Sequence, residues 1–65
     1  MEIKEIRALT GLTQRQFADK YHIPFGTYQK WEVPTESINH RDCPLYVKEL
    51  LERAVREDFQ IKDDL

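Results

Sequence analysis

The sequence has little of what many enzymes and membrane proteins need. Its 65 residues include one cysteine and two glycines, so no intramolecular disulfide and no glycine-rich phosphate loop can form. No serine belongs to a His–Asp constellation and no paired-carboxylate motif is present, so we do not predict an enzyme. No apolar run reaches 18 residues, which excludes a membrane span, and the mixed-charge N-terminus is not typical of a signal peptide.

Metal ligands are also sparse. His40 and Cys43 lie three residues apart and His22 lies elsewhere, without the paired spacing that structural zinc sites use. We therefore predict no metal site and no cofactor. A lone cysteine fits a reducing compartment, and we expect a cytoplasmic protein of a bacterial or phage-infected cell.

Positive charge is not in excess, because the net charge is −2. The first 32 residues carry five basic and four acidic side chains, whereas residues 33–65 carry five basic and eight acidic ones. Binding of phosphates requires a local positive surface rather than a basic whole. The segment 14–30, with three cations and one anion, permits such a surface.

Apolar spacing predicts a small all-α bundle of four helices, or five if the loop holds a short one. Ile3, Ile6 and Leu9 predict a helix over about 2–10, and Gly11 suits the left-handed position after it. Thr13 and Gln16 form a predicted capping box that starts a second helix.

A third helix is predicted over about 24–32, since Pro24 suits a first turn and Tyr28 and Trp31 form an apolar stripe. Residues 34–43 are rich in turn formers and predict a loop, with one helical turn at most around 36–39. Pro44 opens the last helix, for which we expect a wide apolar face. The residues of that face are Leu45, Val47, Leu50, Leu51, Ala54, Val55 and Phe59. The predicted domain spans 1–57, followed by an acidic tail over 58–65 that frays.

The second and third helices are separated by two or three residues around His22. A connection this short turns the chain through roughly 90–120°, which is the geometry of a helix-turn-helix. The stretch L-T-Q-R-Q-F-A-D-K-Y-H-I-P-F-G-T-Y-Q-K-W-E, over residues 12–32, resembles the lambda-repressor-like, Xre-type helix-turn-helix domains of phage and bacterial regulators. Those domains usually have glycine where His22 stands, so we expect His22 in a left-handed turn conformation.

The resemblance implies that the third helix enters the major groove of double-stranded DNA. It also implies an internal ion pair between Arg7 and Glu32 and a contact between a loop cation, Arg41, and the DNA backbone. Gln29 can pair with adenine, Lys30 can reach guanine or phosphate, and Phe25 can touch a thymine methyl group or instead fold back onto the core. The complete set of candidate DNA-binding residues is Gln14, Arg15, Pro24, Phe25, Gly26, Gln29, Lys30 and Arg41.

Two functions remain open at this point. The first is a sequence-specific DNA-binding transcriptional regulator, a repressor or an antitoxin-like protein, acting as a homodimer on a two-fold operator. The second is protein–protein recognition by the same fold, as in a phage-encoded inhibitor or an adaptor that uses the acidic last helix. The weak net charge favours the second function, and the polar face of the third helix favours the first.

Overall fold

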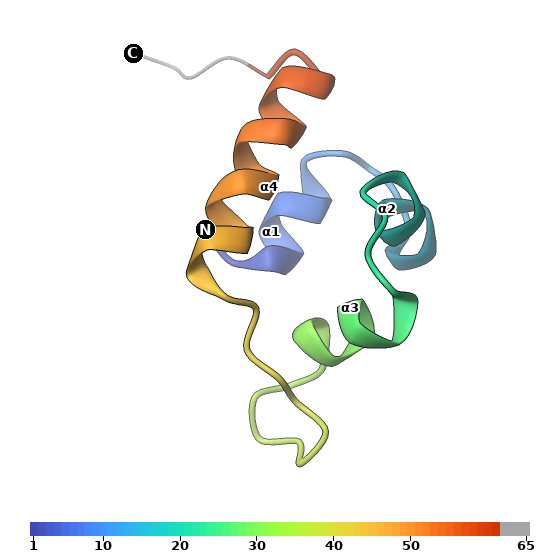
Figure 1. Cartoon of the computed structure of the whole chain (residues 1–65), viewed down its shortest axis with the longest axis vertical. Helices are drawn as coiled ribbons and strands as arrows, with labels where there is room; N and C mark the ends of the chain where they lie inside the picture. The colour runs from blue at the N-terminus through green and yellow to red at the C-terminus, as the bar shows by residue number, and fades with distance from the viewer. Residues whose placement is uncertain (62–65) are drawn as a thin grey trace.

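The computed structural model describes residues 1–61, and within them four helices and no strand form. Figure 1 shows α4 standing beside α1, with α2 and α3 packed together on the other side of α1. The predicted all-α bundle with a helix-turn-helix is confirmed. The helices are α1 (Ile3–Ala8), α2 (Gln14–Lys20), α3 (Phe25–Glu32) and α4 (Leu45–Asp58).

The turns between the first three helices follow the sequence closely. The Thr13 hydroxyl accepts from the Gln16 N–H at 3.1 Å, and the Gln16 carboxamide accepts from the Thr13 N–H at 3.0 Å, so the predicted capping box is confirmed. Gly11 has φ +72°, and His22 has φ +58°. Both lie in the left-handed region, as the sequence predicted.

The core forms where all four helices and the last loop meet. Phe17 and Tyr28 are fully buried with ring centroids 5.4 Å apart. Trp31, expected in the core, is only partly buried and lies at its edge, where its indole meets the Tyr28 ring edge-on. The buried residues are Ile3, Ile6, Phe17, Ala18, Tyr28, Cys43, Leu51 and Val55.

The apolar face of α4 is narrower than the sequence suggested. Leu51 and Val55 are buried, but Leu45 and Leu50 are 67% and 59% exposed, so only part of the predicted face contributes to the core. The physical reason is angular position, because at about 100° per residue Leu45 and Leu50 point roughly 100–120° away from the side of α4 that carries Leu51 and Val55. The six residues of α1, the main helical partner of α4, cover only that side.

The ends of the loop and of α4 also differ from expectation. Residues 36–39 form no helical turn; two turns are closed there by hydrogen bonds from the Ser37 and His40 N–H groups to Pro34 and Ser37 carbonyls. Helix α4 continues to Asp58, and Ile61 packs against the core, so the packed chain extends beyond residue 57. The rest of the predicted tail, 62–65, lies outside the described residues.

None of the helices within residues 1–61 has the length and apolar character that crossing a bilayer requires.

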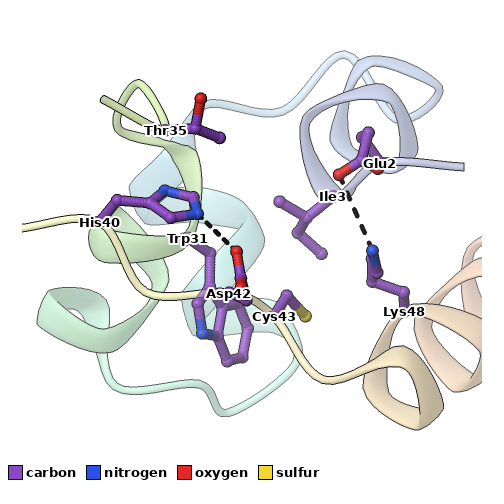
Figure 2. A pocket seen from close by; sticks show the side chains of 8 residues that line it. All are labelled: Glu2, Ile3, Trp31, Thr35, His40, Asp42, Cys43 and Lys48. Atoms are coloured by element: carbon purple, nitrogen blue, oxygen red, sulfur yellow. Dashed lines mark hydrogen bonds and ion pairs between the residues drawn. The ribbon is translucent and has the colours of Figure 1, made fainter. Parts of the chain in front are cut away.

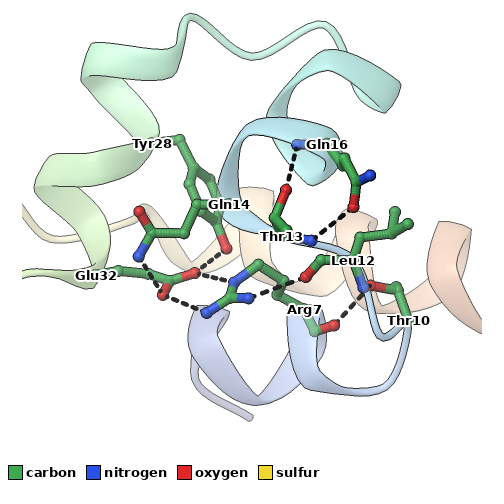
Figure 3. A network of polar contacts seen from close by, with 8 residues as sticks. All are labelled: Arg7, Thr10, Leu12, Thr13, Gln14, Gln16, Tyr28 and Glu32. Carbon is green, nitrogen blue, oxygen red and sulfur yellow. Dashed lines mark hydrogen bonds and ion pairs between the residues drawn. The ribbon is translucent and has the colours of Figure 1, made fainter.

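A single carboxylate joins the first three helices (Figure 3). The side chain of Glu32, at the end of α3, is 2% exposed and accepts from the Arg7 guanidinium of α1 at 2.8 and 3.0 Å. It also accepts from the Tyr28 hydroxyl and, at 3.1 Å, from the Gln14 carboxamide of α2. Arg7 in turn donates to the Leu12 carbonyl at 2.9 Å. The predicted Arg7–Glu32 ion pair is therefore present, as part of a larger network.

The network lowers the pKa of Glu32. Burial alone raises this pKa, but hydrogen bonds from Arg7, Tyr28 and Gln14 outweigh it and hold the carboxylate ionised. A depressed pKa in the folded state means that the stabilisation is fully present above about pH 4.5, the ordinary value, and is lost as pH falls through the folded pKa.

We predict strong coupling between Arg7 and Glu32. Arg7→Met or Glu32→Gln alone leaves a partly buried charge or donor without its partner. Each single change should therefore lower the free energy of unfolding more than the double change does. A double-mutant cycle in urea at pH 7 should give a coupling free energy of about 1–3 kcal/mol. Additive effects would contradict the pairing.

The same variants test the pH dependence. In an acid titration followed by circular dichroism, Glu32→Gln should flatten the loss of stability below about pH 4.5, because the titrating carboxyl is gone. Glu36→Gln, on the exposed loop, is the matched control and should leave the acid limb unchanged.

Candidate nucleic-acid interface

The connection between α2 and α3 fixes the direction of α3. Ile23 donates its N–H to the Ala18 carbonyl at 2.9 Å, and His22 donates to Asp19 at 3.3 Å, so the turn closes onto the end of α2. Pro24, exposed, occupies the N-cap position of α3 with φ −54°, so the helix begins at Phe25, one residue later than the sequence suggested. The two helices thus form the helix-turn-helix unit.

The outer face of α3 has no structural role within the described part of the chain. Gln29 and Lys30 are exposed, and their side chains make no hydrogen bond or ion pair within residues 1–61. Gly26 is exposed on the same side, and a Cβ built there would meet no atom within 4 Å. This face is therefore open for an external partner, as expected from the burial of Tyr28.

Thr27 was missed by the sequence reasoning. It is exposed and flanks the outer face on the side away from Gln29. Helical periodicity could have found it, because at 100° per residue Gly26 and Lys30 mark the centre of the face and Thr27 and Gln29 its two borders.

Phe25 does not stand free at the start of α3. Its side chain is partly buried and packs against the core, and the Arg15 guanidinium carbon lies 4.3 Å from the centroid of its ring. The alternative in which Phe25 folds back onto the core therefore holds. A cation over an aromatic ring is stabilising, and the contact keeps Arg15, otherwise exposed, beside the N-terminus of α3.

Gln14 makes a hydrogen bond within the fold. Its carboxamide nitrogen donates to the Glu32 carboxylate and so links α2 to the end of α3. Of the two candidates on α2, Arg15 is exposed and Gln14 is partly buried.

Arg41 lies in the loop that follows α3 and is tied to that helix. Its N–H donates to the Lys30 carbonyl at 3.0 Å, so its backbone sits beside the last turn of α3. Its exposed guanidinium donates to the His40 carbonyl at 2.8 Å and to the Ile38 carbonyl at 3.3 Å. The structure thus brings Arg41 near Lys30, although the two are far apart in the sequence pattern.

A half-open pocket lies between the start of α1, the end of α3, the loop and the start of α4 (Figure 2). Its volume is about 440 Å³. Trp31 forms one wall, His40 and Asp42 line it from the loop, and Glu2 and Lys48 face each other at 3.8 Å across its rim. Among residues 1–61, no three metal-ligating side chains cluster there or elsewhere.

We predict that Gly26 is not needed for folding. Gly26→Ala should raise the free energy of unfolding by about 0.5–1 kcal/mol, because alanine is the better helix former and the space is empty. Gly11→Ala is the matched control and should lower it by about 1 kcal/mol, because its left-handed φ strains any L-residue. Destabilisation by Gly26→Ala would mean that its surroundings are filled.

Comparison with known proteins gives one match. Residues 3–33, which span α1, α2 and α3, match the family described as Helix-turn-helix (HTH_3). No curated protein and no solved structure matches the chain. The family is one of DNA-binding regulators and is typically non-enzymatic. The matched segment contains the Arg7–Glu32 pair, the capping box at Thr13 and the turn at His22, so residues 3–33 are similar to the helix-turn-helix of the Xre, lambda-repressor-like regulators.

Proposed function

We propose that this protein is a sequence-specific transcriptional regulator, a repressor or an antitoxin-like protein, that reads double-stranded DNA with α3. The observation that carries the proposal is the outer face of α3. Gly26, Gln29 and Lys30 are exposed there, and the side chains of Gln29 and Lys30 make no hydrogen bond or ion pair among the described residues, while the buried carboxylate of Glu32 holds the opposite side of the helix. Such a regulator works in the cytoplasm of a bacterial or phage-infected cell.

Each residue of the face has a distinct role in the proposal. Gln29 pairs with a base edge, for which adenine is the best geometric match, and Lys30 contacts guanine or a phosphate. The absence of a side chain at Gly26 lets the N-terminal turn of α3 come close to the groove. Arg15 and Arg41 contact phosphates on either side of the helix, at the two points where the structure holds them.

Gln29 and Lys30 are exposed, so replacing either should leave folding nearly intact and its effect on DNA binding can be measured separately. Gln29→Ala should cost about 1–3 kcal/mol on a preferred site, selected from a random duplex pool, and relax discrimination at one base pair. Lys30→Ala, if its contact is a phosphate, should weaken all duplexes alike and lower the salt slope by about 1. Mobility shifts over a salt series measure both quantities.

Arg53→Ala is the matched control for loss of one cation, because Arg53 is exposed on α4, away from the helix-turn-helix. It should leave the affinity and the salt slope close to those of the parent. If Lys30→Ala and Arg53→Ala lowered the DNA affinity equally, Lys30 would contribute only through the net charge of the protein and not through its place on α3.

A second candidate function is protein–protein recognition through α4, in a homodimer or with another protein. The observation that favours it is the exposed apolar group Leu45, Tyr46 and Leu50, whose exposed fractions are 67%, 68% and 59%. Exposed apolar side chains that cluster on one helix are typical of an interaction surface. Acidic side chains at Glu49 and Glu57 lie on the same helix.

This second candidate makes its own prediction. Leu45→Ser with Leu50→Ser should leave the free energy of unfolding within about 0.5 kcal/mol of the parent, since both side chains are exposed. Sedimentation should show whether the parent self-associates and whether the double variant does so more weakly. A monomeric parent whose DNA affinity the double variant retains would contradict a dimer built on this face.

A further inference from the structure

The imidazole of His40 lies between two hydrogen-bond acceptors. Its Nδ1 is 2.9 Å from the Val33 carbonyl oxygen, and its Nε2 is 2.8 Å from Asp42 Oδ1 (Figure 2 shows the second contact). Neither oxygen can donate, so both contacts are hydrogen bonds only when both ring nitrogens carry a proton. A neutral imidazole leaves one nitrogen lone pair facing an oxygen.

Through these two contacts His40 joins the start of the loop, at Val33, to its end, at Asp42; we call this arrangement the clamp. Val33 is the C-cap residue of α3, and Asp42 precedes the buried Cys43, which anchors the far end of the loop in the core. Arg41 lies between them. Its N–H reaches the Lys30 carbonyl, and its guanidinium reaches the His40 carbonyl, so its place depends on how His40 is held.

The charged groups around His40 come from three elements. Asp42 and Arg41 belong to the loop itself, and the shared cavity is lined also by Glu2, which precedes α1, and by Lys48 of α4. Glu2 and Lys48 face each other and offset one another. The Cys43 thiol, whose pKa burial raises, adds no charge near neutral pH. Asp42 is therefore the dominant charge at the ring, which is 15% exposed.

We propose that His40 is a positioning residue: as an imidazolium it clamps the loop onto the end of α3 and holds Arg41 beside the recognition helix, so that its deprotonation weakens DNA binding. The DNA-binding part of this inference rests on the proposed function of Arg41. The clamp itself, from Val33 to Asp42, does not.

The direction of the pH effect follows from the two contacts. The hydrogen bond to Asp42, followed by that to the Val33 carbonyl, raises the pKa of His40 above its ordinary value of 6.5. A raised pKa in the folded state means that the clamp contributes fully below about pH 6.5 and is lost as pH rises through the folded pKa. DNA affinity should fall over the same range.

The first experiment measures the clamp without DNA. His22→Asn removes the other imidazole, and asparagine tolerates the left-handed turn there. In this background, nitrogen NMR of the His40 ring over about pH 5 to 9 should show an imidazolium that titrates above the ordinary histidine value. The Arg41 amide shift should follow with the same midpoint. Asp42→Asn should move that midpoint to lower pH.

The second experiment measures binding of the selected duplex in the same background. Affinity should weaken by about fivefold between about pH 5.5 and about pH 8.5, the factor expected for loss of one hydrogen bond. His40→Gln should give a flat pH profile, and Asp42→Asn should shift the profile to lower pH in step with the NMR midpoint. If His40 only supported the fold, Asp42→Asn would not shift the pH profile of DNA affinity together with the midpoint of the His40 ring titration.

The possible failures are separable. A His40 ring that is already neutral near pH 6, or an Arg41 amide that ignores its titration, would overturn the clamp, whether or not DNA binds. A ring and an amide that titrate together while affinity stays constant would overturn the link to DNA binding. Absence of binding to every duplex at every pH would instead contradict the proposed function, and the NMR titration would still decide on the clamp.

Discussion

The arrangement of this small protein depends on one buried carboxylate. Glu32 accepts hydrogen bonds from α1, α2 and α3 at a point where its side chain is 2% exposed. A charge removed from water is tolerated only when donors surround it, so the three helices must meet at this point or leave it unpaired. The position of Glu32 at the end of α3 therefore fixes the rotation of that helix, with Tyr28 inward and Gln29 and Lys30 outward.

That rotation divides the polar residues of the helix-turn-helix into two groups. Arg7 and Gln14 act within the fold, whereas the side chains of Lys30 and Gln29 make no hydrogen bond or ion pair in the described part of the chain, and the space beside Gly26 is open. A weak overall charge does not conflict with DNA binding on such a surface, because the field near a groove depends on local cations. In this account Arg15 is held there by Phe25, and Arg41 by Lys30 and His40.

Features that depend on residues close together in the sequence were predicted, whereas few of the contacts between distant segments were. The capping box at Thr13 and the left-handed turn at His22 depend on local chemistry, and both were predicted. The Arg7–Glu32 pair came from resemblance to a family. Periodicity shows which side chains share a face but not how much of it a partner covers, so it grouped Leu50 with Leu51 on one wide apolar face although Leu50 is 59% exposed. The contacts of Arg15 with Phe25, of Gln14 with Glu32 and of His40 with Val33 arise only when elements pack, and no sequence pattern indicated them.

The outer face of α3 is the surface that we propose for DNA binding. Addition of the selected duplex to ¹⁵N-labelled protein, followed by amide NMR at low salt, tests it most directly. The account predicts that the largest shift changes fall on residues 24–30, at the start of α2 and at Arg41, and that they fade as salt is added. Changes confined to α4, or no change with any duplex at low salt, would contradict it.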